Sequence, residues 1–493
     1  MRSSSPGSGS LTHEQLLAVG SPHRRLYVEA APGSGKTTVS AQRFGLHRFA
    51  SAVDHRAVVA ISFTRSATEE MRSRVLRHWG PSALAWPHRV VTLDTVLYGL
   101  LAHLLQIGVL QWPEGHRELE VLDTWRTTLP TTSTRRKPIL SLEGTRIVPS
   151  TVWAPEHGSQ ATLDDFTIAV RQGKCTHDNV REVLQLALPV EGVGVTLSNF
   201  FDTTIRSLIV DEIYDANDLD LEVIRLAASG GLNVTLVGDP WQALYGFRGA
   251  RPREMRRLIK EHGFTSRPLQ ASFRWRSSVQ GTLALRLRER QRAVLPPGTV
   301  HDVDVVLARH WKTLWDADPH VLPLAIKPRA GQLQEAVCTL LLNEVTQRAF
   351  DMHAAFLNDA LTTLGIKDGD SLAALRPRLR STVDQLAGPS NPRHVWQSLS
   401  QALLDELPTR PPGNGERTPL AGLKGLQARL QVTRPLVPGL TCHQAKGREW
   451  DKVGVKLEET DAGALASGLD PREEDHRSLY VALTRARRVT LAV

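Results

Sequence analysis

A glycine-rich segment near the N-terminus constrains the fold more strongly than any other feature of the chain. It reads Ala30-Ala31-Pro32-Gly33-Ser34-Gly35-Lys36-Thr37 and directly follows the apolar run Leu26-Tyr27-Val28. Small residues let a backbone wrap phosphate oxygens, so that its N–H groups and the next helix N-terminus face negative charge. We expect Lys36 to reach the β- and γ-phosphates and Thr37 to help hold Mg2+. The alternative is a plain turn between a strand and a helix, which the combined strand, loop and helix signals disfavour.

Two adjacent carboxylates end a second apolar run, Leu208-Ile209-Val210-Asp211-Glu212. Open parallel sheets bind ligands at the carboxyl ends of their strands. We therefore expect Asp211 to bind Mg2+ and Glu212 to orient or deprotonate the attacking water. Acidic residues end many strands, so this pair is informative because a phosphate loop accompanies it.

A third segment, Tyr480-Val481-Ala482-Leu483-Thr484-Arg485-Ala486-Arg487, supplies arginines near the end of the sequence. Together, the three segments predict a protein that hydrolyses a nucleoside triphosphate. Their spacing predicts a site between two lobes.

The segment Gly238-Asp239-Pro240-Trp241-Gln242-Ala243-Leu244-Tyr245-Gly246-Phe247-Arg248-Gly249-Ala250 follows the strand-like run Val234–Val237. It resembles motif III of superfamily 1A helicases, the UvrD/Rep/PcrA type. Other segments resemble further motifs of that family, in the family's order: the Q motif at Leu11–Gln15, motif Ia at Ser62–Met71, motif IV at Leu269–Arg274, motif V at Thr441–Trp450 and motif VI at 480–487. The resemblance thus frames the chain from residue 11 to residue 490.

The resemblance implies roles for the residues that match these motifs. Gln15 is expected to read the adenine edge, with Phe273 stacked on the base and Glu449 near the ribose. Gln242 is expected to sense the γ-phosphate, while Arg274 and Arg485 stand where the family places its two arginine fingers. The expected catalytic residues are Lys36, Asp211, Glu212, Gln242, Arg274 and Arg485, and the expected ATP-binding residues are Gln15, Ala31, Pro32, Gly33, Ser34, Gly35, Lys36, Thr37, Thr38, Phe273 and Glu449. Because the arginines come from another lobe than Lys36, ATP binding is expected to close the cleft.

The resemblance also implies a path for single-stranded nucleic acid, which proteins bind by stacking bases on aromatic rings beside a basic groove. Phe63, Thr64 and Arg65 belong to motif Ia, which contacts the strand in this family. Core packing is the alternative for Phe63, which follows a run that looks buried. The full set of expected DNA contacts is Phe63, Thr64, Arg65, Tyr245, Phe247, Arg251 and His443.

Three positions depart from the family's pattern. Tyr214 stands in motif II where glutamine is usual, which puts the coupling of motifs II and III in doubt. Asp94 replaces the usual histidine of motif Ib, and a carboxylate repels phosphate. Arg448 in motif V stands where leucine is preferred and could add a backbone contact. Since none of these changes removes a group that hydrolysis needs, we expect an active ATPase.

Composition supports this interpretation only mildly. The 60 basic residues exceed the 51 acidic ones, giving a net charge of +9, which favours sequence-independent binding to phosphate. The cysteines Cys175, Cys338 and Cys442 show no paired spacing, which argues against a zinc or iron–sulfur site and for a cytoplasmic location. No apolar run approaches the ~20 residues that a membrane span needs. The Ser/Gly-rich residues 1–10 are expected to be a flexible tail rather than a signal peptide.

The resemblance implies an α/β fold with two RecA-like P-loop lobes whose parallel sheets are flanked by helices, and the alternating strands and amphipathic helices of residues 11–95 and 200–265 agree with it. Residues 11–95 and 200–265 are assigned to the first lobe (1A), and residues 266–335 and 435–493 to the second (2A). Residues 96–199 are expected to form a mostly helical insertion (1B) with polar breaks such as Thr131–Pro138. Residues 336–434 are expected to be a reduced helical 2B-like insertion, with amphipathic stretches near 352–364, 371–387 and 395–407 and breaks at Gly388–Pro392 and Pro408–Gly415.

Three functions remain open at this point. The first is an ATP-dependent helicase that moves 3′ to 5′ on single-stranded or tailed duplex DNA. The second is a subunit that senses ATP and DNA to control a partner enzyme and unwinds little, which Tyr214, Asp94 and the small 2B-like insertion favour modestly. The third, a P-loop enzyme unrelated to nucleic acid, is remote. The short 2B-like insertion and a chain that ends at motif VI also resemble the helicase subunit of Gabija-type anti-phage systems. This suggests the motor half of a defence or repair assembly with a nuclease partner.

Overall fold

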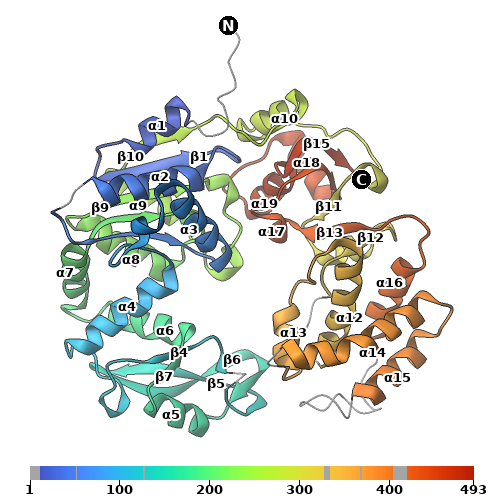
Figure 1. The fold of residues 1–493 in the computed structure, drawn as a ribbon, viewed down its shortest axis with the longest axis horizontal. Coiled ribbons are helices and arrows are strands. Elements are labelled where there is room, and N and C mark those ends of the chain that lie inside the picture. Colours follow the sequence, from blue (N-terminus) through green and yellow to red (C-terminus); the bar gives the residue numbers. More distant parts are fainter. Residues whose placement is uncertain (1–10, 51–52, 126–127, 327–332, 367–368, 404–418) are drawn as a thin grey trace.

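The computed structural model describes residues 11–50, 53–125, 128–326, 333–366, 369–403 and 419–493. The predicted tail at 1–10 and the predicted break at Pro408–Gly415 lie outside these ranges. In Figure 1 the two sheets lie side by side, with the described parts of residues 96–199 below the first sheet and those of residues 336–434 below the second. We call these the first insertion and the helical insertion.

The first sheet is entirely parallel and has the strand order β10-β1-β9-β8-β2-β3. Strands β2 and β8 are buried along their whole length, as expected where helices cover both faces of a sheet. The strands are β1 (Arg25–Ala30), β2 (Ala57–Ser62), β3 (Arg89–Thr92), β8 (Ile205–Val210), β9 (Asn233–Gly238) and β10 (Thr265–Leu269). The helices of this lobe are α1 (His13–Val19), α2 (Lys36–Phe49), α3 (Arg65–Trp79), α8 (Asp218–Ser229) and α9 (Pro252–Glu261).

The second sheet is also parallel, in the order β12-β13-β11-β14-β15. Its strands are β11 (Val305–Ala308), β12 (Val321–Pro323), β13 (Val437–Thr441), β14 (Trp450–Val455) and β15 (Ala486–Ala492). Its helices are α10 (Ser278–Arg288), α11 (Trp311–Trp315), α17 (Cys442–Ala445), α18 (Glu459–Ser467) and α19 (Glu474–Leu483). The predicted α/β fold with two parallel, helix-flanked sheets is therefore confirmed.

One predicted boundary between the lobes is wrong by a few residues. Residues from 266 onward were assigned to the second lobe, but β10 pairs with β1 and forms the edge of the first sheet. Pro268 within this strand is acceptable because an edge strand has one side without ladder partners. The chain thus crosses to the second lobe after Leu269, and motif IV is the crossing itself.

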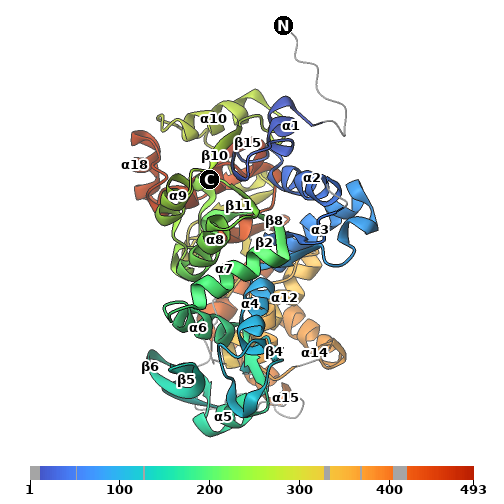
Figure 2. The same ribbon diagram turned by 90° about the vertical axis from the view of Figure 1, so that its left-hand side faces the viewer.

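The first insertion contains more strand than predicted. A long antiparallel hairpin joins β5 (Thr131–Glu143) to β6 (Arg146–Ala161), so the expected polar break at Thr131–Pro138 is wrong. Threonine-rich polar sequence suits an exposed hairpin, and its tip turns at Gly144, whose φ is +63°. The remaining elements are α4 (Leu93–Gln106), β4 (Glu120–Leu122), α5 (Leu163–Arg171), β7 (Lys174–Thr176), α6 (His177–Ala187) and α7 (Val193–Thr204). Figure 2 shows the hairpin at the end of the molecule opposite α10.

The helical insertion forms its own apolar core and is anchored to the second sheet. Its helices are α12 (Leu333–Phe350), α13 (Leu357–Thr363), α14 (Gly369–Ala387), α15 (Pro392–Leu403) and α16 (Leu420–Leu430). Leu322 of β12 belongs to the same core. The buried Arg429 of α16 donates to the carbonyl oxygens of Leu314, Trp315 and Val321, at 3.3, 2.8 and 2.6 Å. None of the helices in the described ranges is long and apolar enough to cross a bilayer.

We predict that Arg429→Ala lowers the free energy of unfolding by about 2–4 kcal/mol, because it leaves several buried carbonyl acceptors unpaired. Urea denaturation followed by tryptophan fluorescence measures this loss. The exposed Arg434 is a matched control, and Arg434→Ala should change stability by less than about 0.5 kcal/mol. Equal stability of the Arg429→Ala and Arg434→Ala proteins would contradict the anchoring role.

Candidate nucleotide site between two lobes

The glycine-rich loop connects β1 to α2 and is held closely from two sides. Gly33 and Gly35 have φ values of +72° and +85°, which favour glycine. A Cβ atom on Gly33 would lie 2.6 Å from the Cβ of Arg274, and one on Gly35 would lie 2.6 Å from Nε2 of Gln15. Motif IV also donates to the loop, from Ser272 Oγ to the Pro32 carbonyl at 2.7 Å. The loop is therefore shaped by Gln15 and by the segment that enters the second lobe.

Gln15 is buried and both ends of its amide are engaged. Nε2 donates to the carbonyl of Ser34 at 2.9 Å, and Oε1 accepts from the backbone N–H of Thr12 at 3.0 Å in a capping box of α1. Thr38 was also predicted to bind ATP. Its hydroxyl oxygen accepts a hydrogen bond from Arg74 of α3 at 2.6 Å. In this arrangement Gln15 braces the phosphate loop directly.

The two carboxylates after β8 lie at the carboxyl edge of the first sheet beside Lys36. Glu212 adopts a left-handed backbone with φ of +55°, and its N–H donates to Asp211 Oδ1 at 2.9 Å. Lys36 Nζ lies 3.7 Å from Glu212 Oε1. Strained backbone of this kind concentrates at functional sites. The structure thus brings Lys36, Asp211 and Glu212 together.

Lys446 is a member of this cluster that the sequence interpretation missed. It follows α17 in the second lobe, and its Nζ lies 2.6 Å from Asp215 Oδ2 and 3.6 Å from Glu212 Oε2. Burial alone would lower the pKa of Lys446, but Asp215 and Glu212 raise it above its usual value. Burial likewise opposes ionisation of Glu212, yet Lys36 and Lys446 lower the pKa of Glu212. In the sequence, the position of Lys446 within the motif V segment was the signal that could have indicated its place in this cluster.

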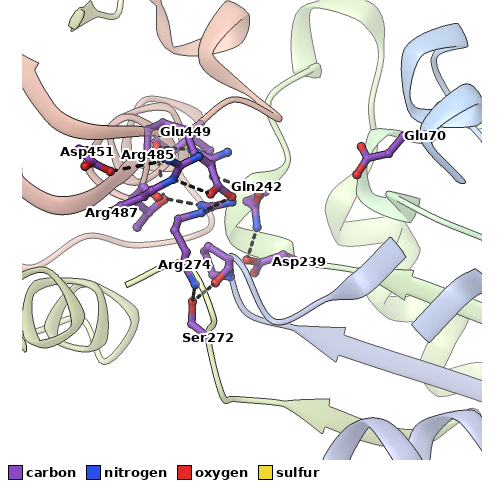
Figure 3. Close-up of polar contacts among 12 residues, drawn as sticks. Glu70, Asp239, Gln242, Ser272, Arg274, Glu449, Asp451, Arg485 and Arg487 are labelled. Carbon is purple, nitrogen blue, oxygen red and sulfur yellow. Dashed lines mark hydrogen bonds and ion pairs between the residues drawn. The ribbon is translucent and has the colours of Figure 1, made fainter. Parts of the chain in front are cut away.

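The two predicted arginines come from different segments: in Figure 3, Arg274 lies on the segment between β10 and α10, and Arg485 lies on the segment that follows α19. Arg274 Nε donates to Glu449 Oε1 at 2.8 Å, and its Nη1 donates to the carbonyl of Thr484 at 2.8 Å. Arg485 Nη2 donates to Gln242 Oε1 at 3.3 Å, and Gln242 Nε2 donates in turn to Asp239 at 2.7 Å. Arg485 and Gln242 therefore connect the two lobes across the site.

Arg485 carries a buried positive charge that its surroundings compensate only partly. Burial and the neighbouring Arg274 guanidinium lower the pKa of Arg485 to about 9. Glu449 is shared between Arg274 and Arg487, and Arg274 lowers its pKa although burial opposes this. A site that concentrates cations in this way favours an anionic ligand such as a phosphoryl group.

A cleft of about 390 Å³ is lined by residues of both lobes. From the first lobe it takes Gly33, Gly35, Lys36, Thr37, Asp211, Glu212 and Gln242, and from the second Arg274, Lys446, Glu449 and Arg485. A larger cavity of about 600 Å³ lies in the first insertion around Trp112 and Arg146 and contains none of these residues. Chemistry rather than size therefore identifies the candidate site.

The oxygen donors around Asp211 fit a hard divalent cation. Burial and the adjacent Glu212 carboxylate raise the pKa of Asp211, although the nearby Lys36 opposes this shift. Ser62 Oγ and Asp215 Oδ1, which belong to residues lining the same cleft, are buried and have no hydrogen-bond partner. The described residues contain no cluster of three or more His, Cys, Asp or Glu side chains suited to a metal. Thr37, Asp211 and phosphate oxygens of the substrate would hold Mg2+, which would neutralise phosphate charge.

Three predicted DNA contacts form an aromatic cluster beside the cleft. The ring centroids of Tyr245 and Phe247 lie 6.0 Å apart, and His443 lies 6.2 and 5.2 Å from them. Phe247 is 66% exposed. Lys446 Nζ lies 5.1 Å from the Tyr245 ring centroid. The same lysine therefore contacts Glu212, Asp215 and the aromatic cluster.

The remaining predicted DNA contacts are engaged within the protein. Phe63 is partly buried against the first-lobe core. Thr64 caps α3 by accepting from the Ala67 N–H, and Arg65 pairs with Asp123. Arg251 forms an ion pair with Asp218 at 3.0 Å. The predicted base-stacking Phe273 is 53% exposed.

The three departures from the family pattern have distinct environments. Tyr214 is buried, and its hydroxyl hydrogen-bonds to that of Tyr27 in β1 at 2.8 Å. Asp94 pairs with Arg181 at 2.8 Å, which offsets the negative charge expected to repel phosphate. Arg448 lines the nucleotide cleft.

Comparison with known proteins identifies the family. The UvrD/REP helicase N-terminal domain model matches residues 11–111 and 181–263, and the UvrD-like helicase C-terminal domain model matches residues 421–491. Together they match slightly more than half of the chain. The first model skips the region of the β5–β6 hairpin.

Curated relatives agree with these models. The "ATP-dependent DNA helicase UvrD2" of Mycobacterium tuberculosis is 25% identical over 570 residues, spanning 98% of this chain and 78% of that protein. The "DNA helicase II" of Escherichia coli is 24% identical over 285 residues, spanning 55% of this chain and 39% of that protein. The "ATP-dependent DNA helicase srs2" of Schizosaccharomyces pombe is 22% identical, spanning 51% of this chain and 31% of that protein. The chain belongs to the UvrD-like helicases of superfamily 1, a family of ATP-hydrolysing enzymes.

Proposed function

We propose that this protein is an ATP-dependent translocase that moves 3′ to 5′ along single-stranded DNA and unwinds tailed duplexes. The observation that carries this proposal is the interlobe contact between Arg485 and Gln242 above a phosphate loop. The relatives named as DNA helicases support DNA as the nucleic acid.

In the proposed reaction, the phosphate loop and Lys36 hold the triphosphate, and Glu212 orients the attacking water. Arg274 and Arg485 neutralise the charge that develops on the transferred phosphoryl group. Glu212 suits its role because Lys36 and Lys446 lower the pKa of its carboxyl group and keep it ionised. Gln242 lies between Asp239 and Arg485, so it responds to movement of either lobe.

DNA is coupled to this reaction through motif III. His443 Nε2 lies 3.0 Å from the Leu244 carbonyl, and buried Arg477 donates to the Ala243 carbonyl at 2.6 Å. Both groups belong to the second lobe and contact the backbone that leads to Tyr245 and Phe247. A base stacked on Phe247 therefore acts on the segment that also carries Gln242.

A subunit that senses ATP and DNA, and unwinds little, is a second candidate. The Tyr214 contact with Tyr27 favours it, because this side chain bonds to β1 instead of linking motif II to motif III by a polar contact. In either case, the protein could supply the motor half of a defence or repair assembly with a separate nuclease, as in Gabija-type systems. Purification from the native host tests that assembly, and isolation without any nuclease-like partner would count against it.

Strand displacement separates the two candidates. The substrates are duplexes with a 3′ tail, a 5′ tail or no tail, each with a fluorophore and a quencher. The helicase proposal predicts ATP-dependent displacement of the 3′-tailed duplex in preference to the others. Brisk ATP hydrolysis without displacement of any substrate would instead support the sensing subunit.

We predict that Glu212→Gln lowers kcat for ATP by about 10²–10⁴-fold, the contribution of a general base, while ATP still binds. Phosphate release and binding of a fluorescent ATP analogue measure the two properties. The exposed Glu254 provides the matched control, and Glu254→Gln should retain full turnover. Lys36→Ala should also abolish turnover, because it removes the cation that reaches the β- and γ-phosphates.

We predict that Arg485→Ala lowers kcat by roughly 10³–10⁵-fold, the range for an arginine finger, and changes nucleotide affinity far less. The contact strengthens in the transition state, so its loss falls mainly on turnover. Arg488→Ala, which removes a 60% exposed arginine side chain nearby, is the control. Normal hydrolysis by Arg485→Ala would show that the two-lobe site is wrong.

We predict that Phe247→Ala spares basal ATP hydrolysis and raises the single-stranded DNA concentration for half-maximal stimulation by roughly 5- to 100-fold, since a stacked base contributes about 1–3 kcal/mol. Titration of a thymidine oligonucleotide in the ATPase assay measures this shift. Phe49→Ala removes an exposed phenylalanine at the end of α2 and should leave the titration unchanged. An identical titration for Phe247→Ala and wild type would exclude stacking at this position.

A further inference from the structure

Asp239 is a buried carboxylate beside the proposed γ-phosphate sensor. Its side chain is 0% exposed. Oδ2 accepts from Gln242 Nε2 at 2.7 Å, and Oδ1 accepts from the backbone N–H of Trp241 at 3.2 Å. A carboxylate removed from water in this way needs a compensating positive charge.

Arg288 supplies that charge from the second lobe. It is the last residue of α10, a helix that packs on β15 and whose Leu287 lies in the second-lobe core. Its Nη1 lies 3.1 Å from Asp239 Oδ1, and its Nη2 lies 3.2 Å from Glu29 Oε1 of β1. Burial alone would lower the pKa of Arg288, but the Asp239 carboxylate and the neighbouring Tyr480 raise it above its usual value. Arg288 is thus held as a cation between the two lobes.

The charge on Asp239 determines which way the Gln242 amide points. An ionised carboxylate only accepts hydrogen bonds, so the NH2 end of the amide must face Asp239. The carbonyl end then faces Arg485, whose guanidinium only donates, and Oε1 accepts from Nη2 at 3.3 Å. The reversed amide would place two donors against each other and leave the carboxylate facing an acceptor.

We propose that Arg288 is a positioning residue for ATP hydrolysis: its ion pair with Asp239 holds that carboxylate against the Gln242 amide and thereby sets the amide to receive Arg485. This inference rests on the proposed function and extends it to a residue outside the helicase motifs described above. The relay runs from Arg288 through Asp239 and Gln242 to Arg485, so both of its ends lie in the second lobe and its centre lies in the first. Within the described part of the chain, the ion-pair partners of Arg288 are Asp239 and Glu29, and neither belongs to the phosphate loop. The proposed path to Arg485 therefore runs through Asp239 and Gln242.

A double-mutant cycle tests the relay with the full chain and saturating single-stranded DNA. The variants are Arg288→Met, Arg288→Lys, Gln242→Ala and the Arg288→Met/Gln242→Ala pair. Arg286→Met is the control, since Arg286 is exposed on the same helix. Measurements are kcat, KM for ATP, affinity for a fluorescent ATP analogue, and the thermal midpoint.

Arg288→Met should lower kcat by roughly 10- to 100-fold, the effect of disordering charge-assisted hydrogen bonds at a reacting centre. Nucleotide affinity should change by less than about threefold, because contacts with the triphosphate remain. Arg288→Lys should recover part of the loss, since an ammonium keeps the charge but not the fork that spans two carboxylates. In the Gln242→Ala background, Arg288→Met should lower kcat by less than about threefold, because residues that act as a unit are not additive.

A normal kcat in Arg288→Met would overturn the proposal. It would also be overturned if Arg288→Met lowered kcat by the same factor in the wild-type and Gln242→Ala backgrounds, because an equal loss indicates a merely structural role. An inactive wild type would instead contradict the proposed function. In that case, the crystal structure of Arg288→Met would test the relay independently of ATP hydrolysis. A Gln242 amide turned away from Arg485 supports the proposal, and an unchanged amide refutes it.

Discussion

Charge balance across the cleft is the constraint on which the rest of the structure depends. The first lobe contributes the carboxylates Asp211, Glu212 and Asp215 at the edge of its sheet, and the second lobe inserts Lys446 and Arg485 toward them. Buried charges of one sign are costly until a partner approaches. The two lobes therefore stabilise each other at the place where a triphosphate is proposed to bind.

The same contacts explain how nucleic acid can influence hydrolysis. Lys446 contacts Glu212, Asp215 and the Tyr245 ring, while His443 and Arg477 reach the backbone of motif III. These contacts connect the aromatic cluster directly to the residues that line the cleft, which is the path for the proposed coupling. Arg288 extends the interlobe contacts on the far side of Gln242.

Local sequence patterns were sufficient to predict the two parallel sheets and the residues at their edges. Buried strands such as β8 are continuous apolar runs, and the residues after them must meet at one edge. The β5–β6 hairpin was missed because its exposed strands lack a clear apolar alternation. Lys446 and Arg288 acquire their roles only when distant segments meet, and nothing in their local sequence distinguishes them from surface cations. Gln15 also shows what the sequence could not predict. Its motif did not indicate that the side-chain amide donates a hydrogen bond to the Ser34 carbonyl of the phosphate loop.

The central claim is that two lobes form one ATP site coupled to single-stranded DNA. Steady-state ATP hydrolysis by the wild-type protein, with and without a thymidine oligonucleotide and at low and moderate salt, tests it most directly. The account predicts strong stimulation by the oligonucleotide that weakens as salt rises, because phosphate contacts release counterions. Hydrolysis at the same rate with and without the oligonucleotide would contradict it.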